Sequence, residues 1–276
     1  MSRRRRTGSR PTTANFSLRK TCSELQGELE QSLRDSLSLR AQGSFMMAVY
    51  RAQDAFKAER ALQKLLQDVS ASPGPVVDPR LRFCTCFNLA LLYHENGLLK
   101  EAAEMYSGMV NTKPWCHSGD RVTEEAIQAH ARVSLGNVYF DQRLYLYAVN
   151  MYVTAYNSLH SDQVSRCKVM HNIGVTYICL KEDDTAASWL QRVVCSVPPD
   201  DVTFSYSRQI RFALQDGQAF HQVHLQSALF SFDLTTLPPS YQEYLAALTG
   251  APPRESPPEP PRAPLATAPY PRQATP

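Results

Sequence analysis

The sequence has little of what membrane proteins and enzymes need. Among its 276 residues, no apolar run is long enough to cross a bilayer as a helix, and no apolar signal sequence precedes the cysteines. No G-x-S-x-G, Walker, Rossmann, H-E-x-x-H or paired-carboxylate motif is present. We therefore expect a soluble, non-catalytic protein with no cofactor, no small-molecule substrate and no membrane insertion.

Charge and cysteine usage exclude further classes. The net charge of +3 does not by itself indicate a nucleic-acid binder, although five positive charges lie in the first ten residues. The seven cysteines are odd in number and irregularly spaced, which favours free thiols in a reducing, cytoplasmic compartment. Cys84 and Cys86, with Cys116 and His117, suggest a zinc site only loosely, because residues two apart on a helix point to different faces. We expect no metal.

The two ends differ in composition from the middle. Residues 1–22 are basic with little apolar content, and residues 251–276 contain ten prolines, so both are expected to be disordered tails. The arginine run could bind nucleic acid, an acidic membrane or a nuclear import receptor, and "PPEPPRAP" could be an SH3-type ligand. A solvated tail and a spacer are the simpler interpretations.

Between the tails, apolar residues recur at three- and four-residue spacing, which predicts one helix after another. The predicted helices span 23–41, 44–69, 81–95, 98–111, 124–142, 144–158, 164–180 and 184–195. No convincing period-two strand separates them, so the predicted class is all-α. The breaks between them, such as "SPGP", "ENG" and "NTKP", are short turns, which implies antiparallel neighbouring helices.

Three segments repeat one pattern of small and large residues. Each begins with an apolar residue, a small residue and, three further on, a tyrosine: Leu89-Ala90-Tyr93, Leu135-Gly136-Tyr139 and Ile173-Gly174-Tyr177. Nine residues after the tyrosine comes an alanine, and four further on a large apolar residue: Ala102 and Tyr106, Ala148 and Tyr152, Ala186 and Leu190. This pattern resembles the tetratricopeptide repeat, a helix-turn-helix unit that stacks into a right-handed superhelix.

The spacing has a packing logic. The small residues, Gly136 and Gly174 among them, and the alanines of the second helices let two backbones approach closely, while the tyrosines fill the layer between units. A degenerate unit upstream carries Ala48, Ala52 and Ala55 but lacks the glycine and tyrosine. Residues 23–200 are thus predicted to form a tetratricopeptide-repeat domain of about four helix pairs. Residues 201–250 contain no such unit, and we expect them to cap the superhelix, fold into its groove, or derive from a truncated or alternatively spliced reading frame.

Stacked repeats create a concave groove lined by their first helices, which suits protein binding. The predicted inward positions are Phe87, Leu91, His94, His130, Val133, Asn137, Phe140, Lys168, His171, Val175 and Ile178. This largely apolar lining would suit an amphipathic helix from a partner or from the chain itself. Co-chaperone repeats hold acidic C-termini with Lys, Asn and Arg, whereas Phe87 and Leu91 stand where the first repeat would need Lys and Asn. Lys168 and Asn137 alone do not rebuild that clamp.

The order of particular residues suggests a closer resemblance. The strings "GSFMMAVYRAQDAFKAERAL", "LGNVYFDQRLYLYAVNMY" and above all "RCKVMHNIGVTYI" resemble the N-terminal repeats of the polaris family, the large tetratricopeptide subunit of the intraflagellar transport B complex. The resemblance covers roughly residues 8–200, whereas proteins of that family are much longer and continue with more repeats. A Bardet-Biedl-type ciliary repeat protein fits the string around Gly174 less well.

The resemblance implies a non-catalytic structural subunit that supports assembly of cilia and flagella. Its partners would be other intraflagellar transport B-complex proteins and, indirectly, kinesin and dynein motors. Its location would be the cytoplasm and the cilium or flagellum, including axoneme and basal body. The alternative is a cytosolic adaptor, co-chaperone-like or part of another complex, whose groove captures helical peptides.

Overall fold

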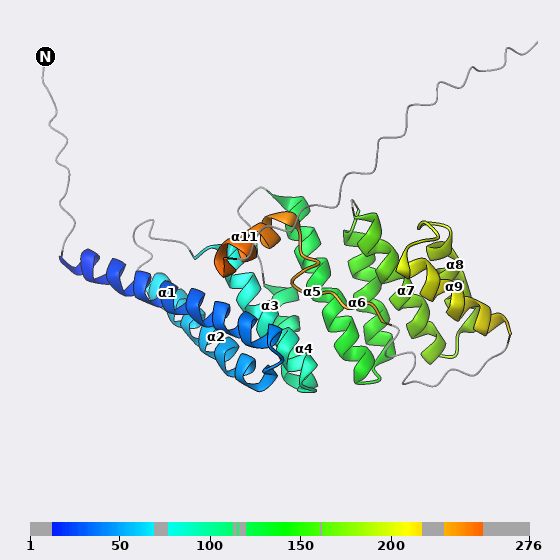
Figure 1. Cartoon of the computed structure of the whole chain (residues 1–276), viewed down its shortest axis with the longest axis horizontal. Coiled ribbons are helices and arrows are strands. Elements are labelled where there is room, and N and C mark those ends of the chain that lie inside the picture. The colour runs from blue at the N-terminus through cyan, green and yellow to red at the C-terminus, as the bar shows by residue number, and fades with distance from the viewer. Residues whose placement is uncertain are drawn as a thin grey trace, which may run out of the picture.

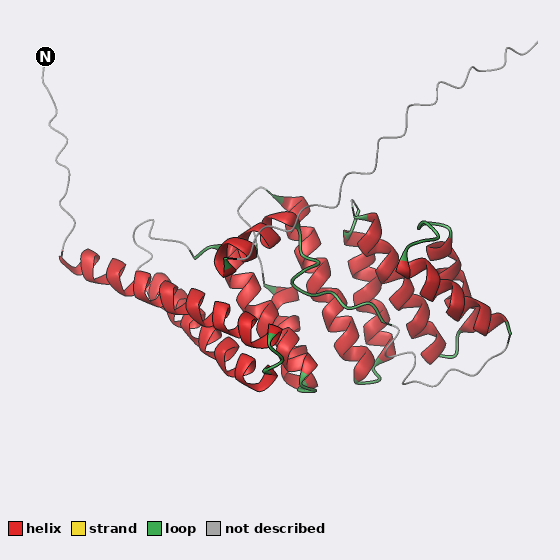
Figure 2. Ribbon diagram, viewed as in Figure 1, coloured by secondary structure: helices red, strands yellow, loops and turns green. Residues whose placement is uncertain are grey.

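The computed structural model describes residues 13–68, 77–112, 115, 120–160, 162–216 and 229–250. Within these ranges the chain forms ten helices and no strand (Figure 2). The helices are α1 (Thr13–Ala41), α2 (Phe45–Asp68), α3 (Pro79–Glu95), α4 (Leu99–Asn111), α5 (Arg121–Asp141), α6 (Tyr145–Ser158), α7 (Gln163–Cys179), α8 (Asp183–Val194), α9 (Val202–Gln215) and α11 (Pro239–Thr249). The predicted all-α class is confirmed.

The helix boundaries lie close to those predicted from apolar spacing. Seven of the eight predicted helices agree with α2 to α8 within three residues at both ends. The exception is α1, which ends where predicted but begins at Thr13, ten residues early. Apolar periodicity does not detect these first turns, because they carry few apolar residues. The "SPGP" break, most of the N-terminal tail and the whole of the proline-rich tail at 251–276 lie outside the described residues.

One residue type begins the first helix of each successive unit. Asp78, Asp120, Asp162 and Asp201 are the N-caps of α3, α5, α7 and α9, and each carboxylate accepts a hydrogen bond from a main-chain N–H of the first turn. The aspartate satisfies a donor that the helix leaves unpaired, and its negative charge favours the positive end of the helix dipole. These caps explain why the first helices begin where the inter-repeat loops end.

The turns inside the helix pairs share a left-handed residue four positions after the repeat tyrosine. Gly97 fills this position in the first of the three units with a φ of 73°, while Arg143 and Lys181 adopt 63° and 64° in the next two. The left-handed conformation suits glycine, because a Cβ atom meets the following carbonyl oxygen there. Arg143 and Lys181 are therefore strained at a turn position where the first of the three units has a glycine.

We expect Arg143→Gly to stabilise the protein by about 0.5–1 kcal/mol. The left-handed conformation costs roughly 1–2 kcal/mol for a residue with a Cβ atom, and the added freedom of the unfolded glycine chain offsets part of that gain. Urea unfolding midpoints would measure the change. The reverse substitution Gly97→Arg is the matched control and should destabilise by a similar amount. A clear loss of stability in Arg143→Gly would contradict this interpretation.

Consecutive helices pack as antiparallel pairs, and the pairs stack side by side from α1 and α2 to α7 and α8, with α9 packed on α8 (Figure 1). Each first helix also packs against the second helix of the preceding pair, as in a tetratricopeptide-like superhelix. Two large apolar clusters hold the stack, one centred on α3, α4 and α5 from Ile127 to Val138, the other on α5 to α8. No helix within the described ranges is both long enough and apolar enough to cross a membrane.

The residues predicted to pack the repeats lie between helices. Ala102, Ala148 and Ala186 are fully buried, and Tyr93, Tyr139 and Tyr177 are half-buried at the edges of the clusters. The glycines face the large residue of their own second helix. A Cβ atom on Gly136 would lie 2.5 Å from the Tyr152 ring, and one on Gly174 would lie 2.9 Å from Cγ of Leu190. The small residue thus makes room for a bulky side chain of the second helix and, at Gly174, also for the main chain of Ala186, whose carbonyl oxygen would lie 3.4 Å from the added Cβ atom.

The described residues after position 200 lie in two different parts of the molecule. Helix α9 packs on α8 and touches α7, which is the place a further first helix would take in the stack. Residues 229–250, which we call the returning segment, run back over the first helices and end in α11 (orange in Figure 1). Both arrangements were anticipated for residues 201–250 as alternatives.

Candidate functional site

The inner surface, formed by the first helices α3, α5 and α7, carries the returning segment. Its residues contact α7 first, then α5, then the neighbourhood of α3 and finally α1, so the segment runs opposite to the order of the repeats. An irregular chain in such a place needs partners for its main-chain polar groups, because water cannot reach all of them. The inner surface supplies those partners from polar side chains.

The main chain of Phe230 is held by two asparagines. Asn172 on α7 accepts a hydrogen bond from the Phe230 N–H at 2.8 Å and donates from Nδ2 to the Phe230 carbonyl oxygen at 2.9 Å. Asn137 on α5 donates from Nδ2 to the same carbonyl at 3.3 Å. Tyr152 donates to Oδ1 of Asn137 at 2.6 Å, which orients the amide. Both polar groups of one peptide residue are thereby satisfied in a buried setting.

Two further side chains of α5 continue the contact with the main chain. Ser134 Oγ donates to the Phe232 carbonyl at 3.3 Å. His130 lies between two carbonyl oxygens, with Nε2 2.6 Å from that of Thr236 and Nδ1 2.8 Å from that of Ala126. Burial lowers the pKa of His130, against the two carbonyl oxygens that favour the protonated ring.

The aromatic side chains of the returning segment alternate with exposed positions. The Phe232 ring is 1% exposed and stands edge-on to His130 at 4.9 Å between ring centres. The Phe230 ring meets His171 in the same way, also at 4.9 Å, while Ser231 between them is exposed. Edge-to-face pairs of this kind contribute roughly 0.5–1.5 kcal/mol beyond the burial of apolar area. The alternation shows that the segment is extended here.

After this extended stretch the segment bends into a helix for reasons visible in its sequence. Asp233 accepts from the N–H of Thr235 at 2.8 Å, and Thr236 Oγ1 donates to the Asp233 carbonyl at 2.8 Å, which closes a turn. Pro239 takes the first helical position, where its missing N–H costs nothing. Gly250 ends the helix in the left-handed conformation with a φ of 69°.

Helix α11 is anchored at both ends. The hydroxyl of Tyr241 donates to the Trp115 carbonyl, and its ring stands edge-on to Phe83 at 5.6 Å between ring centres. At the other end Arg34 Nε donates to the Leu248 carbonyl at 2.7 Å. The returning segment therefore connects α7, through α5, to α3 and α1.

Only some of the residues predicted to line the groove hydrogen-bond or stack on the returning segment. Asn137 and His171 contact the returning segment, as does His130. His94 instead pairs with Asp141 at 2.6 Å, and Lys168 is half-buried. The remaining predicted lining residues are buried: Phe87, Leu91, Val133, Phe140, Val175 and Ile178. Among them, Phe87 shares an apolar cluster with Tyr241 of the returning segment, and Val133 shares one with Phe232.

Two contact residues, Ser134 and Asn172, were not on the predicted list. They occupy the same repeat position as Asn88, two residues before the small residue of each first helix. A polar residue recurring at one position of otherwise apolar helices is a detectable signal, because buried polar groups need specific partners. In the first of these units Asn88 donates to Ser36 Oγ on α1 at 2.9 Å instead.

Two of the four residues of the loosely suggested zinc site lie on α3. Cys84 and Cys86 are buried, and burial raises the pKa of both thiols, that of Cys86 to about 12. Cys116 and His117, the other members of the loosely suggested zinc site, lie outside the described residues. Within the described ranges no three His, Cys, Asp or Glu side chains are grouped to hold a metal ion.

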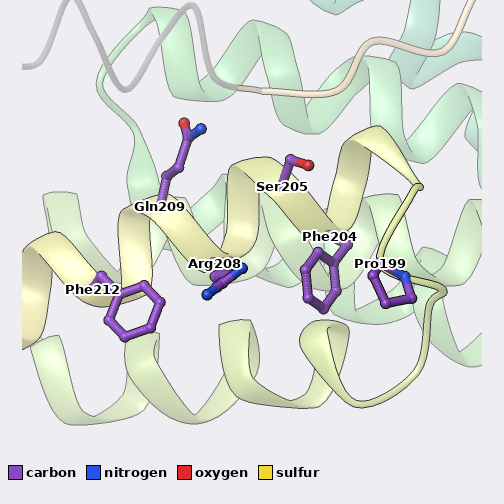
Figure 3. Close-up of a pocket in the computed structure, with 6 residues that line it drawn as sticks. All are labelled: Pro199, Phe204, Ser205, Arg208, Gln209 and Phe212. Carbon is purple, nitrogen blue, oxygen red and sulfur yellow. The ribbon is translucent and has the colours of Figure 1, made fainter.

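A separate open pocket of about 550 Å³ lies on α9. Figure 3 shows Phe204, Arg208 and Phe212 along one edge of the helix, facing α8, with Ser205 and Gln209 on the opposite edge. The Arg208 guanidinium carbon lies 5.3 Å from the centre of the Phe212 ring. The pocket is an apolar cleft of the last packed helix, and it brings no titratable pair together that would do chemistry.

Comparison with known proteins agrees with this architecture. No model of a known protein family matches the chain. The human Intraflagellar transport protein 88 homolog is 27% identical over 176 residues, which cover 63% of this chain and 20% of that protein. The chain thus spans about a fifth of the length of this curated relative.

Stacked antiparallel helix pairs with an inner surface that binds an extended chain define a helical-repeat protein of the tetratricopeptide type. Within that class the chain resembles the polaris family, whose human relative is the Intraflagellar transport protein 88 homolog. The resemblance predicted from "RCKVMHNIGVTYI" and its neighbouring strings is thereby confirmed.

Proposed function

We propose that the protein is a non-catalytic scaffold of the intraflagellar transport type, which supports assembly of a cilium or flagellum by binding other proteins. The observation that carries this proposal is the identity of 27% over 176 residues with the human Intraflagellar transport protein 88 homolog. The stacked helices support it, because such solenoids offer extended surfaces for several partners.

The partners that follow from this proposal are other proteins of the intraflagellar transport B complex and, through them, kinesin and dynein motors. The places of action are the cytoplasm, the basal body and the axoneme of the cilium or flagellum. Exposed apolar side chains at the starts of second helices offer a surface for such partners: Met46, Met47 and Tyr50 on α2, and Leu146 and Tyr147 on α6. Large apolar side chains left exposed in this way are candidate contacts for another protein.

A second candidate is a cytosolic adaptor that captures peptides and has no ciliary role. The observation that favours it is the inner surface itself, where Asn137 and Asn172 hold main-chain groups of a bound segment. Surfaces that bind a main chain accept many sequences, so this adaptor would not need the partners of a transport complex.

Expression of the tagged full chain in ciliated cells separates the two candidates. We expect enrichment at basal bodies and axonemes, and recovery of B-complex proteins in a pull-down. The variant Leu146→Asp/Tyr147→Asp, which changes only exposed side chains, should fold normally and lose part of that recovery. A diffuse cytoplasmic signal without B-complex proteins would contradict the transport proposal, and recovery of unrelated proteins would then favour the adaptor.

A further inference from the structure

The side chains of α5 and α7 hydrogen-bond the returning segment through its main chain, while its buried side chains pack in the apolar clusters. Five polar contacts join these side chains to the main-chain atoms of three residues: the N–H, which donates to Asn172, and the carbonyl of Phe230, the carbonyl of Phe232 and the carbonyl of Thr236. Hydrogen bonds to main-chain atoms carry affinity without reading side-chain identity. The polar part of the site would therefore accept another extended chain in the same register.

The site requires particular side chains at two positions of the chain that it binds. In an extended chain, residues i and i+2 point to the same side, so Phe230 and Phe232 both face the repeats. Their rings meet the edges of His171 and His130, each at 4.9 Å between ring centres. A competing chain would thus need two aromatic side chains separated by one residue.

The site is also formed by groups that lie outside the segment it holds. Tyr152 on α6 orients the Asn137 amide at 2.6 Å, and Ser207 on α9 lies 2.7 Å from Nδ1 of His171. Both contacts belong to the helical stack and persist whichever chain occupies the surface. Binding to groups that are already oriented loses less entropy, which is the property expected of a true binding site.

We propose that the inner surface is a binding site for an extended partner segment that carries aromatic residues at positions i and i+2. Residues 229–250 are then a tethered occupant, which this partner displaces. This proposal goes beyond the intraflagellar transport role and rests on the contacts alone. A tether of short length keeps its segment at an effective concentration of about millimolar, so a free partner must overcome that competition. Weakening the tethered segment should therefore expose the site.

The test uses full-length protein and a fluorescent peptide with the sequence of residues 229–250. We expect the wild-type chain to bind this probe weakly, because its site is occupied. Phe230→Ala/Phe232→Ala in the chain should release the tethered copy and strengthen probe binding by at least about tenfold, in line with removal of a tethered competitor. Adding Asn172→Leu to that variant should weaken probe binding again by about tenfold, since two hydrogen bonds to the peptide are lost.

Three controls keep the result interpretable. A probe with both phenylalanines changed to serine should not bind, and Phe212→Ala on α9 should leave probe binding at the wild-type level. If the double variant does not fold, as judged by circular dichroism, Phe230→Ala alone replaces it, because that ring is only half-buried.

Equal probe binding by wild type and released variant, or none by a folded released variant, would overturn the proposal. Concentration-dependent dimers of the wild type would also overturn it, because the occupant would then be a second copy.

Discussion

Gly174→Leu is expected to destabilise the repeat domain by about 1–3 kcal/mol or more, through overpacking. A Cβ atom at this position would lie 2.9 Å from Cγ and 3.0 Å from Cδ2 of Leu190, and 3.4 Å from the Ala186 carbonyl oxygen. Leu190 is fully buried and cannot move aside without disturbing α8. The gain in helix propensity over glycine, about 1 kcal/mol, is too small to offset the clash.

Gly108→Leu is the matched control for this prediction. Gly108 also lies inside a helix, α4, but a Cβ atom there would meet nothing within 4 Å. The propensity gain should therefore appear without the clash, and the variant should be stabilised by up to about 1 kcal/mol. Thermal unfolding would show opposite shifts in Tm, with roughly 2–4 °C for each kcal/mol in a domain of this size. A Gly174→Leu variant with the Tm of the wild type would show that the repeat register is wrong.

Phe232→Ala is expected to cost about 3–5 kcal/mol if the returning segment stays in place, as for other buried aromatic residues. The ring is 1% exposed and belongs to the apolar cluster of α5 to α8. The returning segment can also detach from the inner surface. The free energy of that detachment is therefore the largest loss of stability that this substitution can cause. Urea unfolding gives the total loss, and amide exchange at Phe230 reports detachment, since that N–H donates to Asn172.

Phe212→Ala provides the comparison for the loss at Phe232. This phenylalanine is 46% exposed in the open pocket of α9, and its removal should cost less than about 1 kcal/mol with no change in exchange at Phe230. A Phe232→Ala variant that kept both the wild-type stability and the slow exchange at Phe230 would contradict the packing described for the returning segment.

Much of the helical stack could be predicted from spacing in the sequence. Apolar periodicity located α2 to α8, because each helix buries one face against its neighbours. Gly136 and Gly174 each lie twelve residues before the alanine of their second helix, Ala148 or Ala186, and this spacing marked a close helix contact. The structure adds that the Tyr152 ring and the Leu190 side chain approach these glycines most closely. The early start of α1 was missed because its first turns carry no apolar pattern.

The candidate site was predicted less completely, and the reason is geometric. Apolar periodicity predicts which face of a first helix is the inner one. It does not predict which residues of that face will contact a distant part of the chain. Ser134 and Asn172 hydrogen-bond the main chain of the returning segment, while Val133 and Val175 belong to an apolar cluster that also contains Phe232. The repeat position shared by Ser134, Asn172 and Asn88 was the signal that distinguishes them.

Caps, turns and apolar spacing act over a few residues, so the all-α class and most of the helix ends could be predicted from them, and short sequence strings carried the family resemblance. What occupies the inner surface became known from the tertiary structure. The hydrogen bonds that place Phe230 on Asn172 and Tyr241 on Trp115 join residues 58 and 126 positions apart. No local pattern encodes such a pairing, because it depends on the whole stack being formed and on the main-chain groups of an extended chain meeting the side chains that the stack presents.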